Sequence, residues 1–121
     1  MSNQNKPRSH EPIVWLLFAA GGMVAAMLMP ALVLITGIGA PLGLLAEDSL
    51  SYERVIGMLG SPVGKLLAFP LISLLFWHAM HRIFHGLHDL GIHAGLAYYR
   101  VLCYGFALFA TLLTAGILFL I

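Results

Sequence analysis

The sequence has few charged residues and a single cysteine. Only 9% of its 121 residues are charged, whereas 60% are hydrophobic, and the mean hydropathy is +0.94. A soluble domain has about 25% charged and about 45–50% apolar residues, and a chain of this length leaves too much surface in water to hide more. The composition therefore excludes a soluble globular domain and a disordered chain. A lone Cys103 also excludes a disulfide scaffold.

The chain likewise lacks a basic surface and an obvious catalytic centre. Six Lys and Arg against five Asp and Glu give a net charge of +1, which is too little for a nucleic-acid interface. We find no nucleophile–base pair, no paired carboxylates, no phosphate-binding loop and no cysteine cluster. Any catalysis would therefore have to come from another subunit.

Three apolar stretches are each long enough to cross a bilayer, which takes about 20 residues. We predict a single all-α membrane domain over 1–121 with transmembrane helices at about 13–36, 62–88 and 98–121. Residues 1–12 are expected to form a flexible tail. Residues 46–61 are expected to form a polar loop that contains a short surface helix.

Local signals set the helix ends. Ser61 followed by Pro62 is typical of an N-cap and a first helical residue, and Gly91 is a plausible stop for the same helix. We expect Pro30 to kink the first span and the helix to end near Thr36-Gly37.

Lys and Arg near the helix ends predict the orientation. Four lie on the side of the N-terminus (Lys6, Arg8, Arg82, Arg100), and Arg54 and Lys65 lie on the other. Because cytoplasmic segments carry the excess of Lys and Arg, we expect a cytoplasmic N-terminus, a periplasmic C-terminus and a periplasmic 46–61 loop.

Small residues at a four-residue spacing favour close helix packing, within the chain or with a partner. The first span carries Gly22 and Ala26 in this pattern, beside Gly21 and Ala25. The third span carries Ala107, Thr111 and Ala115.

Ionisable residues at membrane depth are costly and are therefore functional candidates. Four histidines, spaced to share one face of the second helix, stand beside Arg82: His78, His81, His85 and His88. Antiparallel first and second helices would bring Trp15 and Phe18 to the depth of His81, Arg82 and His85. Indole, guanidinium and imidazole donors suit the carbonyl oxygens of a quinone head, and imidazole can relay its protons.

Other interpretations of these residues remain open. Trp15 alone is typical of an interfacial anchor, and Arg82 alone of a topology residue. His78, the deepest histidine, is a weak candidate for a haem ligand, but a partner chain would have to supply the second one. Zinc is less favoured, because three histidines on one helical face do not enclose a metal. A small transporter or assembly protein could also use the histidine face to relay protons or metal.

Three segments carry a resemblance to a known family. They are residues 8–15 (RSHEPIVW), 48–55 (DSLSYERV) and 81–90 (HRIFHGLHDL) with His93. With the length and the span order, they resemble the D subunit of bacterial four-subunit fumarate reductase, the smaller of its two hydrophobic anchors. The likeness covers essentially the whole chain.

The resemblance implies a non-catalytic anchor subunit in the bacterial inner membrane. In that family a flavoprotein subunit with FAD reduces fumarate, an iron–sulfur subunit feeds it electrons, and two anchors hold the pair at the membrane and bind menaquinol. The resemblance implies quinone contacts for Trp15, with Phe18, His81, Arg82 and His85 near the same site.

The resemblance also implies a complex without haem, although His78 stands where the family pattern has no histidine. Since succinate dehydrogenases share this architecture, a haem-bearing anchor of such an enzyme is the alternative that His78 keeps open. The resemblance does not separate fumarate reduction from succinate oxidation.

Overall fold

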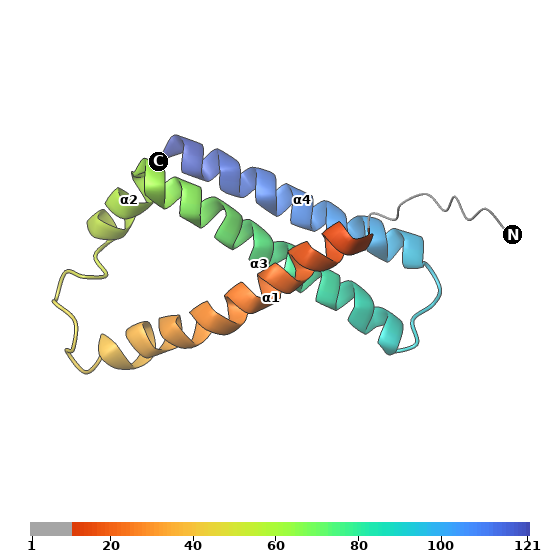
Figure 1. The fold of residues 1–121 in the computed structure, drawn as a ribbon, viewed down its shortest axis with the longest axis horizontal. Coiled ribbons are helices and arrows are strands. Elements are labelled where there is room, and N and C mark those ends of the chain that lie inside the picture. The colour runs from red at the N-terminus through yellow and green to blue at the C-terminus, as the bar shows by residue number, and fades with distance from the viewer. Residues whose placement is uncertain (1–10) are drawn as a thin grey trace, which may run out of the picture.

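The computed structural model describes residues 11–121, and the regular structure in this range is helical (Figure 1). The elements are α1 (Glu11–Val33), the π-helix η1 (Leu34–Gly39), α2 (Tyr52–Gly60), α3 (Pro62–Asp89) and α4 (Leu96–Leu120). Within the described residues, three helical stretches are long and apolar enough to span a membrane: Trp15–Gly39, Pro62–Asp89 and Leu96–Leu120. The predicted all-α fold with three spans is confirmed. Residues 1–10 of the expected tail lie outside the described residues, and the orientation stays a prediction.

The first helical stretch is longer at both ends than predicted. It begins at Glu11, so that Pro12, expected in the tail, lies in the first turn, where proline is tolerated. The end expected near Thr36-Gly37 lies slightly later, because the helix continues as η1 to Gly39.

The hydrogen bonds explain this extension. Pro30 cannot donate to the helical ladder, and a few residues later the bonding has widened to a π-helix. At its end, the Ala40 N–H donates to the Ile35 carbonyl at 2.9 Å. The Thr36 hydroxyl donates to the Leu32 carbonyl at 2.7 Å. Backbone N–H and C=O groups in an apolar medium must form hydrogen bonds inside the chain. The helix therefore continues until the turn after Gly39 can supply these hydrogen bonds.

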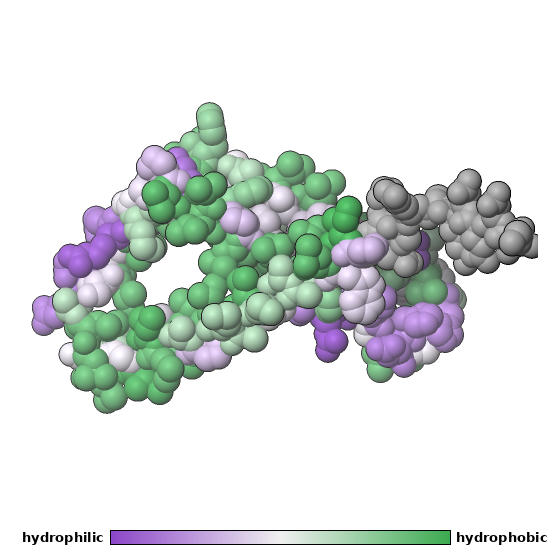
Figure 2. Space-filling view, in the orientation of Figure 1, coloured by the Kyte–Doolittle hydropathy of each residue, from purple (hydrophilic) through white to green (hydrophobic). Residues whose placement is uncertain are grey.

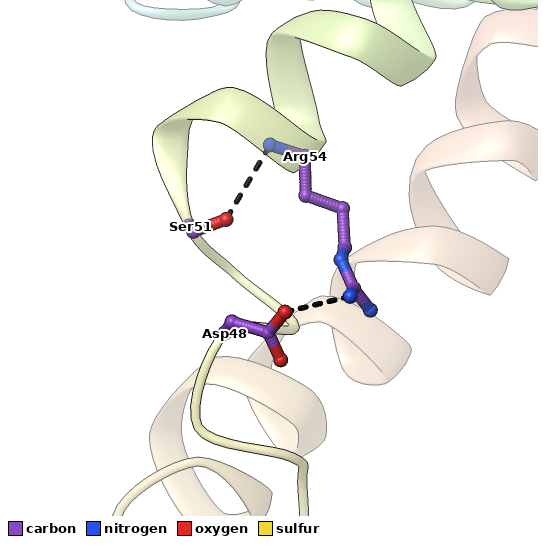
Figure 3. A network of polar contacts seen from close by, with 3 residues as sticks. All are labelled: Asp48, Ser51 and Arg54. Atoms are coloured by element: carbon purple, nitrogen blue, oxygen red, sulfur yellow. Dashed lines mark hydrogen bonds and ion pairs between the residues drawn. The ribbon is translucent and has the colours of Figure 1, made fainter.

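The short helix expected in the 46–61 loop is α2, and its place at the membrane surface stays a prediction. Its N-cap is Ser51, whose hydroxyl oxygen accepts from the Arg54 N–H at 3.4 Å, and the Arg54 guanidinium pairs with the Asp48 carboxylate at 2.7 Å (Figure 3). Both charged side chains are exposed, so this pair contributes little to the stability of the protein.

Both predicted ends of α3 are confirmed. Ser61 caps the helix by accepting from the Gly64 N–H at 3.0 Å, and Pro62 follows it. At the other end, Gly91 has a φ of +80°. The Gly91 N–H donates to the His88 carbonyl at 3.0 Å and the Ile92 N–H donates to the Leu87 carbonyl at 3.1 Å, which is the Schellman arrangement.

Helix α3 is central, and α4 packs along it (Figure 1). The buried stripe of α4 consists mostly of small side chains: Cys103, Ala107, Ala110, Thr114 and Leu118. Of the predicted pattern on this helix, Ala107 is fully buried within the chain, whereas Ala115 is exposed. A strict four-residue spacing drifts off a face that repeats every 3.6 residues.

Helix α1 crosses α3 at Gly21. A Cβ on Gly21 would lie 2.6 Å from the Leu74 carbonyl oxygen, so only glycine allows this approach. Of the predicted α1 pattern, Gly21 is buried and Gly22 half-buried at the crossing, whereas Ala26 is exposed. Beyond this crossing α1 diverges from α3 and leaves a gap between the two helices. The surfaces that border this gap are largely apolar (Figures 1 and 2).

Candidate functional site

The five residues predicted to form a site line one depression of about 260 Å³. Trp15 and Phe18 reach it from α1, and His81, Arg82 and His85 reach it from the last third of α3. The expected proximity of these groups is therefore observed. We call this feature the α1–α3 depression.

Rings in edge-to-face and tilted contacts form the wall of the α1–α3 depression. The centroids of Trp15 and Phe18 lie 6.5 Å apart in an edge-to-face arrangement. The Phe18 ring lies 4.5 Å from that of His81, which lies 4.3 Å from that of His85. Contacts of this kind stabilise aromatic groups beyond simple burial, so the rings are held as a group.

The hydrogen-bond donors of the depression lie at its open side. Trp15 is 69% exposed, and Arg82 and His85 are also exposed, whereas Phe18 and His81 are half-buried. The depression thus combines a packed aromatic wall with an indole N–H, a guanidinium and imidazole nitrogens. Such a site can hold a flat ring that carries hydrogen-bond acceptors at its edge.

Tyr104 is a site residue that the sequence reasoning missed. Its hydroxyl lies 2.7 Å from Nδ1 of His81 and links α4 to α3. The available signal was a phenol inside an apolar span, one turn after Arg100. Because His81 uses Nδ1 on Tyr104, its other nitrogen, Nε2, is the one left for a ligand.

A second, larger cavity of about 720 Å³ adjoins the α1–α3 depression, and Phe18 and His81 line both. The remaining lining is mostly apolar: Leu17, Pro70, Ser73, Leu74, Trp77 and Tyr104. Sequence reasoning did not find this cavity, because apolar side chains in a membrane span carry no distinctive signal.

Two polar side chains that line the large cavity, Trp77 and Ser73, differ in their hydrogen bonding. The Trp77 indole N–H donates to the Thr111 hydroxyl at 3.0 Å, a second polar link from α3 to α4. The Ser73 hydroxyl is buried and has no hydrogen-bond partner among residues 11–121. Its oxygen remains open to a partner from outside the chain.

The remaining histidines of α3, His78 and His88, contact different parts of the chain. His78 contacts α1, with Nδ1 2.9 Å from the Phe18 carbonyl oxygen. The His88 ring contacts His93 in the following loop, with centroids 4.8 Å apart. Within residues 11–121, no group of three or more His, Cys, Asp or Glu is placed to hold a metal ion. Of the four histidines on this face, His78 and His81 contact Phe18, His85 contacts His81, and His88 contacts the following loop.

Comparison with known proteins decides the family. The family model for the D subunit of fumarate reductase matches residues 5–119. The chain belongs to the fumarate reductase D-subunit family. It is 46% identical over 121 residues to the fumarate reductase D subunit of Aliivibrio fischeri, with full coverage of both chains.

Other members of the family are similar to the chain over most of their length. The protein of the same name from Vibrio cholerae is 46% identical over 119 residues, which cover 98% of this chain and 91% of the relative. The one from a Shewanella species is 45% identical over 95 residues, covering 78% of each. The resemblance carried by the three sequence segments is thus confirmed.

Family membership and the three spans together define the kind of protein. The chain is a multi-pass inner-membrane protein and a membrane-anchor subunit of fumarate reductase that is not itself catalytic. This agrees with a sequence that has no catalytic constellation of its own.

Proposed function

We propose that this subunit holds the catalytic part of fumarate reductase at the membrane and supplies one wall of its menaquinol site. The partners would be an iron–sulfur subunit, a flavoprotein subunit and a second hydrophobic anchor. FAD and iron–sulfur clusters would belong to those partners, and no haem is expected in this chain.

The observation that carries the quinol proposal is the meeting of five residues at one end of α3. Trp15, Phe18, His81, Arg82 and His85 come from two helices and line the same depression. Their chemistry fits a quinone head, since the rings offer stacking surface and the N–H groups donate to carbonyl oxygens. Each of them alone has an ordinary explanation, but the five together favour a ligand.

The large cavity supports the same ligand class. Menaquinol has a ring with two oxygens and a long apolar tail. The α1–α3 depression carries the donors, and the adjoining cavity is apolar and larger. A ligand that is polar at one end and apolar along its length fits this gradient.

The chemistry required of this chain is modest. Oxidation of menaquinol releases two electrons and two protons, and the electrons would pass to the iron–sulfur subunit. His81 and His85 would accept these protons, because a neutral imidazole has a nitrogen lone pair that can bind a proton. Arg82 and Trp15 would orient the ring by donating hydrogen bonds to its oxygens.

The quinol proposal is tested by Trp15→Ala in the assembled complex in native membranes. Loss of the indole should reduce quinol-dependent fumarate reduction, whereas activity with a soluble viologen donor should stay nearly intact. Tyr52→Ala is the matched control, because Tyr52 is an aromatic residue with similar exposure, 74%, on α2. Equal loss of both activities in Trp15→Ala would contradict a quinone role and leave assembly as the explanation.

The anchoring proposal is tested by purifying this chain from native membranes in mild detergent. We expect it to bring down a large subunit that carries flavin fluorescence on a denaturing gel. A chain that purifies alone, or with unrelated partners, would contradict the proposal.

A further inference from the structure

His78 lies where α1 crosses α3 and is not a lining residue of the α1–α3 depression. Its Nδ1 is 2.9 Å from the carbonyl oxygen of Phe18, and its ring stacks on the Phe18 ring with centroids 4.5 Å apart and planes within 11°. Since a carbonyl oxygen can only accept, Nδ1 must carry the hydrogen. One side chain thus fixes both the backbone and the ring of Phe18.

The α1 backbone leaves space for this imidazole. A Cβ on Gly22 would lie 2.7 Å from Cε1 of His78, and a Cβ on Gly21 would lie 2.9 Å from the His78 Cβ. Two successive glycines therefore let the ring sit directly against α1. His78 fits into the crossing as a packed residue with a defined hydrogen bond.

Phe18 links His78 to the α1–α3 depression. Its ring contacts both His78 and His81, with centroid distances of 4.5 Å to each, and it lines both the depression and the large cavity. A shift of Phe18 would change the shape of both spaces. The position of Phe18 depends on a residue outside the depression.

We propose that His78 is a positioning residue of the menaquinol site, which acts by donating a hydrogen bond to the Phe18 carbonyl and holding the Phe18 ring against His81. This inference rests on the proposed quinol function. It gives His78 a role distinct from that of an iron ligand.

The test separates the hydrogen bond from the ring in the assembled complex in native membranes. His78→Phe keeps a ring that can stack on Phe18 but has no N–H, whereas His78→Asn keeps an N–H at the place of Nδ1 and loses the ring. We expect His78→Phe to raise the KM for menaquinol about three- to tenfold, in line with one lost hydrogen bond. His78→Asn should raise it less, and kcat and viologen-dependent activity should change little in both.

His88→Phe is the matched control, because it makes the same substitution on the same helix at a histidine that contacts His93. It should leave the KM unchanged. An unchanged KM in both His78 variants would overturn the proposal, as would a parallel loss of both activities, which indicates a purely structural role.

Two further outcomes identify which part of the account is wrong. A haem absorbance band in the reduced-minus-oxidised spectrum that disappears in both His78 variants would overturn the positioning role and assign His78 to iron. If Trp15→Ala leaves quinol activity unchanged, the proposed function itself has failed. If Trp15→Ala lowers it but His78→Phe does not change the KM, the positioning role alone has failed.

Discussion

The hydroxyl of Tyr104 lies 2.7 Å from Nδ1 of His81, so a residue of α4 holds a ring that lines the α1–α3 depression. His81 therefore contacts three neighbours: Tyr104, Phe18 and His85. This fixes the ring orientation, and Nε2 has no hydrogen-bond partner among residues 11–121. The depression thus depends on all three spanning helices, although its lining comes from two.

Tyr104→Phe removes this hydrogen bond and keeps the ring. An interhelical hydrogen bond in a membrane protein contributes about 0.6 kcal/mol on average and up to about 2 kcal/mol. We expect a small loss in the thermal stability of the complex, and a larger relative loss of quinol-dependent than of viologen-dependent activity. Tyr98→Phe, at an exposed tyrosine near the start of the same helix, should change neither. A Tyr104→Phe complex with unaltered quinol kinetics would show that the link to α4 is dispensable.

Gly21→Ala tests the helix crossing. The added Cβ would lie 2.6 Å from the Leu74 carbonyl oxygen, and this backbone atom cannot move aside cheaply. We expect destabilisation of about 1–3 kcal/mol, as for other overpacked sites, measured as a lower midpoint of thermal aggregation in mild detergent. Gly116→Ala is the control, since a Cβ there would meet nothing within 4 Å. Equal midpoints for the two variants would contradict the close crossing.

Leu17→Trp tests the large cavity. Leu17 lines it and is about half exposed, so a bulkier side chain should narrow the space proposed for the apolar tail. We expect a higher KM for long-tailed quinols and little change for short-tailed analogues. Leu16→Trp makes the same change at an adjacent exposed residue outside the lining. A KM that rises equally for both tail lengths would place the tail elsewhere.

Arg82→Ala tests the charged donor of the depression. A hydrogen bond from a charged group contributes about 1.5–3 kcal/mol, so its loss should raise the KM for quinol roughly ten- to hundredfold. The control is Arg54→Ala, which removes a guanidinium from the exposed pair with Asp48 near α2. The KM for quinol in both complexes is the measurement. A similar KM in the two variants would assign Arg82 to topology alone.

The spans were predictable because composition and local chemistry determine them. Ser61, Pro62 and Gly91 act through their own backbone geometry, and the structure has the expected cap and stop at these residues. The shared depth of Trp15, Phe18 and His81 followed from antiparallel first and second helices. These inferences require no knowledge of which faces pack together.

The missed features depend on tertiary packing. The third span is apolar on every side, so its sequence does not reveal that Ala110 and Thr114 are buried while Ala115 is exposed. The partnership of Tyr104 with His81 joins residues 23 positions apart on two helices. Continuation of the first helix to Gly39 depends on which backbone partners the following turn supplies.

Photoaffinity labelling tests the central claim most directly. An azido-menaquinone analogue would be photolysed with the intact complex in native membranes, with and without excess menaquinol, and the labelled peptides of this chain would be sequenced. We predict labelling at Trp15–Phe18 or at His81–His85 that excess menaquinol suppresses. Labelling of this chain only at other residues, or labelling that menaquinol does not suppress, would contradict a quinol site at the α1–α3 depression.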